Sequence, residues 1–192
     1  MQNSQQIKEL QKRIALYEDL KAYHALYDLL FDPLKHFCFS FVKSNEVAEE
    51  MVSDVFIKLW QIKNKLHEID NLKVYLYTVA KNFCINYITR HFKNPVVTLG
   101  ELDIEPVLYL GNPEELCISA DLVAKIRQTI LQLPSQCRLI FQMVKEDGMR
   151  YKEVAEVLGL SVLTVRNQLA IAVKKMGETL PRYVLDDIRK PG

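Results

Sequence analysis

The chain has 192 residues, 49% of them hydrophobic, which is enough to bury one large core or two small ones and excludes an intrinsically disordered chain. The formal net charge of +1 favours neither an acidic nor a basic partner. The distribution of charge is more informative. Residues 1–93 hold 13 basic and 11 acidic residues, residues 94–118 hold 5 acidic and no basic ones, and residues 119–192 hold 12 basic and 8 acidic ones.

The first hundred residues predict helices, because they show no strand-like alternation and glycine first occurs at their very end. One helix is expected over 7–20 and a second over 23–42, bent or restarted at Pro33. Asn45 is a suitable cap for the third helix, and a fourth spans 72–91. The buried stripes predicted for the first, third and fourth helices are Ile7, Leu10, Ile14 and Tyr17; Ala48, Met51, Val52, Val55, Phe56 and Leu59; and Leu72, Leu76, Val79, Ala80, Phe83 and Tyr87.

Two of these helices carry unusual polar patterns. Glu46, Glu50 and Asp54 recur every four residues, and like charges at that spacing repel by roughly 0.2–0.5 kcal/mol per pair. A basic partner would relieve this repulsion, although a solvated acidic face is the alternative. The fourth helix mixes cations, aromatics and amides, as single-stranded nucleic acid requires, although several of its tyrosines could instead be core residues. Its members are Lys73, Tyr75, Tyr77, Lys81, Asn82, Asn86, Arg90 and His91.

Residues 94–118 interrupt the helical pattern with three of the seven prolines and an acidic excess, which predicts an interdomain linker. Beyond it, helices are expected over 120–133 and over 135–145, the latter started by Pro134. A turn is expected at Asp147-Gly148.

Residues 151–176 predict two short helices around a tight turn. Gly159 suits the left-handed position that ends the first helix, and Ser161 is a good cap for the second. The second helix has an inward stripe of Val165, Leu169, Ala172 and Met176, which leaves exposed Thr164, Arg166, Asn167, Ala170 and Lys174. This is the pattern of a helix-turn-helix, whose second helix lies in the major groove and reads bases with its N-terminal residues. An ordinary helical hairpin with a solvated basic face is the alternative.

The sequence offers little to an enzyme. Cys38, Cys84, Cys117 and Cys137 are scattered without a C-x-x-C pair, so neither a structural zinc site nor a disulfide framework is predicted. The four histidines form no cluster, and we expect no catalytic residue, metal, cofactor or small-molecule substrate. Free thiols, with no signal peptide and no apolar run of about 20 residues, predict a cytoplasmic protein.

Over residues 20–180 the chain resembles an extracytoplasmic-function (ECF) sigma factor, a small two-domain specificity subunit of bacterial RNA polymerase. Three stretches carry the likeness in the family's order. AEEMVSDVFIKLW (48–60) resembles the core-binding helix, and YLYTVAKNFCINYITR (75–90) resembles the helix that melts the promoter and reads the −10 element. The stretch from 133 to 176 resembles the domain that reads the −35 element.

The resemblance implies roles for individual residues. Those implied to dock on core polymerase are Glu50, Ser53, Asp54, Phe56 and Trp60, with Ser53 where the motif usually has Gln. The loop 67–73 is implied to pocket a base flipped from the non-template strand, and Asn82 to read the −10 element. The −10 set is His67, Asp70, Asn71, Lys73, Tyr75, Lys81, Asn82 and Arg90, with Tyr75 in place of the usual Trp. The −35 set is Ser161, Thr164, Arg166, Asn167 and Lys174.

These observations predict an all-α protein of two small helical domains joined by a flexible acidic linker. The expected parts are an extension (1–19), a region 2 domain (20–93), the linker (94–118), a region 4 helix-turn-helix domain (119–180) and a tail (181–192). Expected partners are core RNA polymerase, promoter DNA in duplex and single-stranded form, and an anti-sigma factor, which in this family is often membrane-bound. The rival interpretation is a stand-alone helix-turn-helix regulator whose first half senses a ligand or dimerises.

Overall fold

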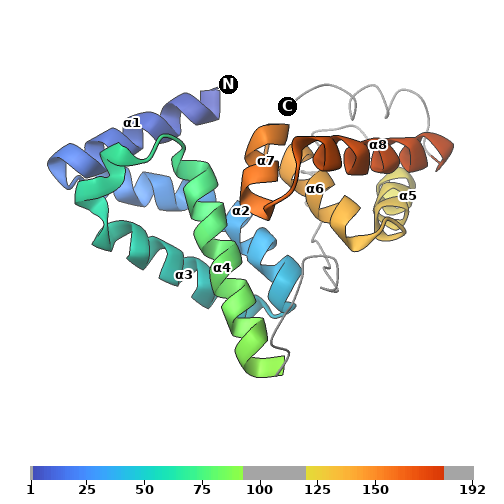
Figure 1. The fold of residues 1–192 in the computed structure, drawn as a ribbon, viewed down its shortest axis with the longest axis horizontal. Helices are drawn as coiled ribbons and strands as arrows, with labels where there is room; N and C mark the ends of the chain where they lie inside the picture. Colours follow the sequence, from blue (N-terminus) through green and yellow to red (C-terminus); the bar gives the residue numbers. More distant parts are fainter. Residues whose placement is uncertain (1, 93–119, 180–192) are drawn as a thin grey trace. The chain divides into compact units, whose positions relative to one another are not determined.

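The computed structural model describes residues 2–92 and 120–179, and the predicted linker 94–118 and tail 181–192 lie outside them. The chain divides into two compact units, Met1–Val97 and Thr98–Gly192. Within the described residues every element is helical, which confirms the all-α prediction. Figure 1 labels the elements, which are α1 (Gln2–Tyr17), α2 (Leu20–Val42), α3 (Asn45–Gln61), the 3-10 helix η1 (Lys63–Glu68), α4 (Leu72–Phe92), α5 (Ala120–Leu131), α6 (Ser135–Lys145), α7 (Tyr151–Leu158) and α8 (Val162–Thr179).

Unit 1 is built around α2, which packs against α1, α3 and α4. Asp19 caps the start of α2, because its carboxylate accepts hydrogen bonds from the backbone N–H groups of Lys21 and Ala22. The helix continues through Pro33 as one helix, which excludes the restart, one of the two effects predicted for this residue. Its apolar face is almost completely buried, through Leu26, Leu30, Leu34, Phe37 and Cys38.

Two predicted boundaries in unit 1 need correction. The cap of α3 is Ser44 rather than Asn45, because the Ser44 hydroxyl accepts a hydrogen bond from the Val47 N–H at 3.3 Å. Tyr17 was expected in the core but is 74% exposed. It is the last residue of α1, and the chain turns at Glu18, where φ is +48°.

The buried face of α4 also differs from the predicted stripe. Leu72, Leu76 and Ala80 are buried as expected, but further along the helix the buried residues are Cys84 and Ile88. Val79, Phe83 and Tyr87 are only partly buried. The inward face therefore shifts by one position, since the second half of α4 packs with Cys84 against the Cys38 carbonyl of α2.

Unit 2 packs α5, α6 and α7 around α8. As predicted, Gly159 takes the left-handed conformation that ends α7, with φ of +69°. Gly148, in the predicted turn before α7, is also left-handed, with φ of +63°. The Leu160 N–H bonds to the Ala155 carbonyl, and α8 then departs at 110° to α7. The predicted inward stripe of α8 is confirmed, because Val165, Leu169, Ala172 and Met176 are each at most 5% exposed.

Candidate nucleic-acid and protein interfaces

The outer face of α3 is acidic and accessible. Glu46, Glu50 and Asp54 are all exposed. The Ser44 hydroxyl donates a hydrogen bond to Glu46 and lowers the pKa of that carboxyl, which favours its charged form. Ser53 is also exposed. Its hydroxyl donates a hydrogen bond to the Glu49 carbonyl, with 2.9 Å between the two oxygens.

Behind this face an aromatic cluster supports α3. Phe56 is 1% exposed and therefore cannot touch a partner, so its expected direct contact with polymerase has to be revised. Its ring lies 4.7 Å from that of Tyr27, measured between centroids, and its carbonyl accepts a hydrogen bond from the Tyr23 hydroxyl. The half-buried Trp60 ring packs edge-on against Tyr23 at 5.1 Å. Phe56 positions the helix, whereas Trp60 stays partly accessible at its end.

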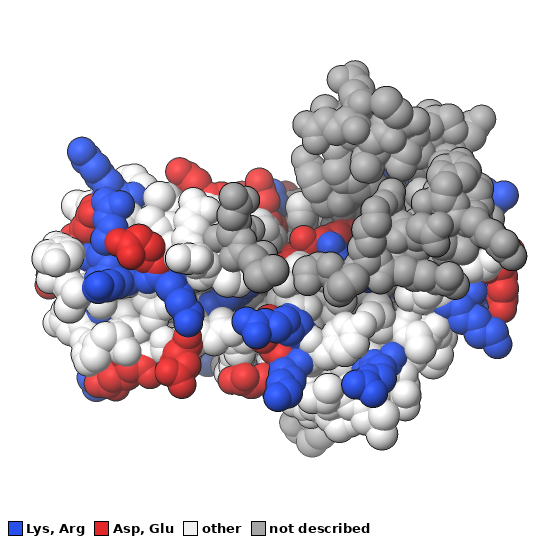
Figure 2. Space-filling model, turned by 90° about the horizontal axis from the view of Figure 1, so that it is seen from above, with Lys and Arg blue, Asp and Glu red and all other residues white. Residues whose placement is uncertain are grey.

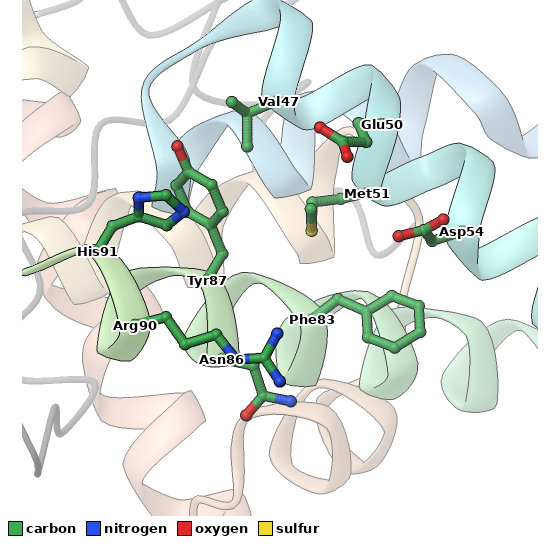
Figure 3. Close-up of a pocket in the computed structure, with 9 residues that line it drawn as sticks. All are labelled: Val47, Glu50, Met51, Asp54, Phe83, Asn86, Tyr87, Arg90 and His91. Atoms are coloured by element: carbon green, nitrogen blue, oxygen red, sulfur yellow. The ribbon is translucent and has the colours of Figure 1, made fainter.

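A groove of about 560 Å³ separates α3 from the second half of α4 (Figure 3). Glu50 and Asp54 stand on the α3 wall, and Phe83 and Tyr87 stand on the α4 wall. The Tyr87 ring packs at 4.2 Å against His91. The side chains that the sequence assigned to the core of α4 therefore line a groove shared with the acidic face. Phe83 and Tyr87 each precede a buried residue, Cys84 and Ile88, by one position. Which of the two sets faces the core is decided by the packing of α2 and α3 against α4.

The start of α4 gathers several of the predicted −10 residues. His67, near the end of η1, and Asp70, in the segment that joins η1 to α4, are both exposed. Asn71 has a structural role, because its side-chain oxygen accepts the Val74 N–H at 3.2 Å and caps α4. The segment is also held from α1, since the buried Gln11 amide donates to the carbonyls of Leu66 and Ile69.

Further along α4 the predicted −10 residues differ in accessibility. Lys73, Tyr75 and Lys81 are half-buried, and burial raises the pKa of Tyr75 and lowers that of Lys81. Tyr77 is fully buried and belongs to the core, so it offers no stacking surface.

The exposed members of the −10 set on α4 are Asn82 and Arg90. Tyr75 and Arg90 are 15 residues apart, or about 22 Å along a helix. Arg90 lines the groove beside α3 rather than the segment at the start of α4. The set therefore spreads along the helix instead of forming one cluster.

On α8 the predicted −35 residues occupy one accessible face. The Ser161 hydroxyl accepts the Thr164 N–H at 2.9 Å and lies 2.8 Å from the Thr164 hydroxyl, which confirms Ser161 as the cap. Arg166, Asn167 and Lys174 are exposed on the following turns. These are residue types that recognition helices use to bond base edges and phosphates.

Two residues near these surfaces were missed at the sequence level. Leu163 is 63% exposed on the first turn of α8, where an apolar side chain can contact a thymine methyl. The sequence could have predicted this exposure, because Leu163 lies outside the inward stripe of α8. Gln11 is 7% exposed. The sequence could have predicted its burial, because this polar residue lies beside the buried stripe of Ile7, Leu10 and Ile14.

The described residues hold no group of three or more side chains suited to a metal ion. Among them no single helix is long and apolar enough to cross a membrane, and only α7 and α8, taken together across their bend, pass that test.

Comparison with known proteins identifies the family. The family model described as Sigma-70 region 2 matches residues 26–93, and Sigma-70 region 4 matches residues 124–176. The chain is 26% identical over 136 residues to the ECF RNA polymerase sigma-E factor of Escherichia coli K12, covering 67% of this chain and 71% of the relative. The chain belongs to the ECF sigma factors. Sigma factors are transcription initiation factors, and the alternative of a stand-alone regulator is not favoured.

Further matches agree. The RNA polymerase sigma-H factor of Pseudomonas aeruginosa PAO1 is 23% identical over 147 residues, covering 73% of this chain and 76% of the relative. Among solved structures, CnrH in complex with the cytosolic domain of CnrY is 19% identical, with a TM-score of 0.56 over 90% of this chain and 96% of that one. The sigma factor RpoE of Bartonella quintana, in complex with the anti-sigma factor NepR, is 20% identical, with a TM-score of 0.55 over 88% and 99%. These two structures share the fold of this chain.

Proposed function

We propose that unit 1 mounts the chain on core RNA polymerase through the outer face of α3. Glu50 and Asp54 present exposed carboxylates to a basic partner surface, and Trp60 adds partly accessible apolar area at the end of the helix. Ser53 contributes van der Waals contact to this surface rather than a hydrogen bond to polymerase, because its hydroxyl already donates to the Glu49 carbonyl of α3. Phe56 supports the surface from the core. The face is rigid, since α2 and its aromatic side chains hold it from behind.

The start of α4 reads the −10 element as single-stranded DNA. Its half-buried Tyr75 offers one ring face for a base, while Lys73 and Lys81 supply nearby positive charge. His67 and Asp70 line the position where a flipped base is received, with Asn71 holding the helix start. Asn82 and Arg90 extend the contact along the strand. Flipping a base costs a few kcal/mol, so these contacts must offset that cost for the DNA to open.

The outer face of α8 reads the −35 element as duplex DNA. Arg166 and Asn167 reach base edges in the major groove, and Lys174 contacts a phosphate. Ser161 and Thr164 form the first turn, whose N–H groups favour a phosphate oxygen. The work of the chain is therefore binding rather than catalysis.

The cellular setting follows from these partners. Core polymerase and promoter DNA place the protein in the cytoplasm. An anti-sigma factor that covers the α3 and DNA-reading faces would keep it inactive. One solved structure supports this partner, since the sigma factor RpoE of Bartonella quintana is in complex with the anti-sigma factor NepR.

The observation that carries the proposal is that unit 1 joins an acidic face on α3 to a helix that carries cations, amides and a half-buried tyrosine, while unit 2 exposes Arg166, Asn167 and Lys174 on the second helix of its helix-turn-helix. The test is transcription of fragmented genomic DNA by core polymerase with and without the chain, followed by sequencing of RNA 5′ ends. We expect new start sites preceded by two shared sequence blocks. Core polymerase that neither retains the chain nor gains start sites would refute the proposal.

A further inference from the structure

Helix α1 lies outside the matched region 2 segment, which begins at residue 26, yet it is part of the core of unit 1. Ile7, Leu10 and Ile14 are buried against α2, η1 and α4. Within this apolar contact Gln11 is only 7% exposed. Its side-chain amide forms hydrogen bonds with the backbone around the end of η1. It donates to the Leu66 carbonyl at 2.6 Å and to the Ile69 carbonyl at 2.7 Å. A buried polar group with two such partners fixes their relative position, because losing it removes a buried donor from both carbonyls, although the Leu66 carbonyl keeps the hydrogen bond from the Ile69 N–H.

The segment that Gln11 holds carries His67 and Asp70. A hollow of about 390 Å³ lies between this segment and α1, within the range of small-ligand sites. From the segment it is lined by His67, Ile69 and Asp70; from α1 it is lined by Lys8, Gln11, Lys12, Ala15 and Leu16. These α1 positions recur at helical spacing, so one whole side of the helix forms the wall.

We propose that α1 is a wall of the −10 site, in which Lys8 and Lys12 bind the phosphates of the strand whose base the 67–70 segment receives. Gln11 is the positioning residue that holds this segment in place. The inference rests on the proposed function and assigns a new contact surface and a new positioning residue to it.

The charges around the hollow favour a nucleic-acid strand. Lys8 and Lys12 are exposed, and among the described residues neither forms an ion pair. Two neighbouring cations at the same end of unit 1 are occupied, since Arg13 pairs with Asp19 and Lys63 pairs with Glu18. Figure 2 views the molecule from above and shows basic and acidic side chains mixed at the end that α1 covers. Lys8 and Lys12 remain available beside the proposed base-receiving segment, whose own Asp70 can accept from a base amino group but not bind a phosphate.

The first test measures binding of the full holoenzyme, core polymerase with the chain, to a promoter fragment whose −10 region is already single-stranded. The fragment comes from the start sites recovered by the transcription experiment. The logarithm of the binding constant falls with the logarithm of the salt concentration, and each lost phosphate contact to a single strand makes this slope less steep by about 0.7. We expect the double variant Lys8→Ala/Lys12→Ala to make the slope less steep by about 1.4 and to weaken binding about tenfold near 0.1 M salt. Lys21→Ala, an exposed lysine on the first turn of α2, is the matched control.

The second test separates positioning from mere structural support. Gln11→Met keeps the length of the side chain but removes the donor. Four probes that differ only at the captured base measure its preference. We expect the ratio between the best and the worst base to shrink by about tenfold with core binding unchanged, while the urea midpoint of unit 1 falls because two buried carbonyls lose a donor. An unchanged preference would overturn the role of Gln11.

Failure here is distinguishable from failure of the proposed function. If the wild-type chain directs specific transcription but Lys8→Ala/Lys12→Ala keeps the wild-type salt slope, only the α1 contact is refuted. If the double variant instead loses affinity for core polymerase, α1 contacts protein and the assignment to DNA is wrong. If the wild-type chain gives no specific start sites, the proposed function itself has failed.

Discussion

The two units present their candidate binding residues in different ways. In unit 2 the residues that point to DNA belong to one helix, and Arg166, Asn167 and Lys174 stand exposed on its outer face. In unit 1 the corresponding residues are spread from η1 along α4, and some of them, such as Tyr75 and Lys81, are half-buried. A duplex groove accepts a convex helix, whereas an unpaired base needs a surface that surrounds it. Function in unit 1 therefore depends on its packing more directly than function in unit 2.

The largest expected effect tests this dependence in the core of unit 1. Phe56→Ala removes a ring that is 1% exposed and should lower the free energy of unfolding of unit 1 by about 3–5 kcal/mol. Trp60 is the only tryptophan of the chain, so its fluorescence during urea unfolding reports on unit 1 alone. The control is Ile57→Ala, whose side chain is 53% exposed and whose loss should cost about 0.5 kcal/mol or less. Equal effects at the two positions would contradict the assignment of Phe56 to the core.

A smaller effect is expected at the exposed recognition helix. Arg166→Ala removes donors to a base edge and should weaken promoter discrimination by about 1–3 kcal/mol. Binding to core polymerase and the unfolding midpoint should not change, because the side chain is exposed. Competitive transcription from matched and mutated −35 sequences measures the loss. Arg127→Ala, an exposed arginine on α5, provides the control, and a comparable loss there would mean that any surface cation of unit 2 suffices.

Tyr75 tests whether unit 1 stacks on an unpaired base. Tyr75→Ala should reduce strand opening by about 1–3 kcal/mol, the usual contribution of one aromatic side chain. Tyr75→Phe keeps the ring and should retain most of the activity. Permanganate reactivity of the opened −10 region reports strand opening directly. If the alanine and phenylalanine variants behave alike, the hydroxyl rather than the ring face makes the contact.

The smallest effect concerns the junction of α1 and α2, where the Arg13 side chain hydrogen-bonds to Asp19 and lowers the pKa of that carboxyl below its usual value. A carboxyl with a lowered pKa stabilises the fold above its unfolded pKa, and this contribution is lost as the pH falls through the folded value. Asp19→Asn should therefore lower the urea midpoint slightly at pH 7, with the difference vanishing at strongly acidic pH. Asp28→Asn controls for net charge, and a difference that grows on acidification would contradict the assignment.

Local chemistry explains which parts of the structure could be predicted. Gly159 and Ser161 were predictable because a helix end and a helix cap depend on neighbouring residues only. The buried face in the second half of α4 was not predictable in this way, because contacts with α2 decide whether Phe83 or Cys84 points inward. A small apolar thiol is among the most buried residue types, and this signal favoured Cys84. The bonds of Gln11 join positions 55 and 58 residues apart, which no local pattern reveals.

The measurement that bears most directly on the central claim is the affinity of the Asp54→Arg variant for core polymerase. Reversing this exposed charge on α3 should weaken binding by about 2–5 kcal/mol, while Asp28→Arg on α2 should leave it unchanged. The fold of unit 1, followed through Trp60 fluorescence, should be the same in both. Wild-type affinity in a folded Asp54→Arg variant would contradict the account, because α3 would then not be the surface that mounts the chain on polymerase.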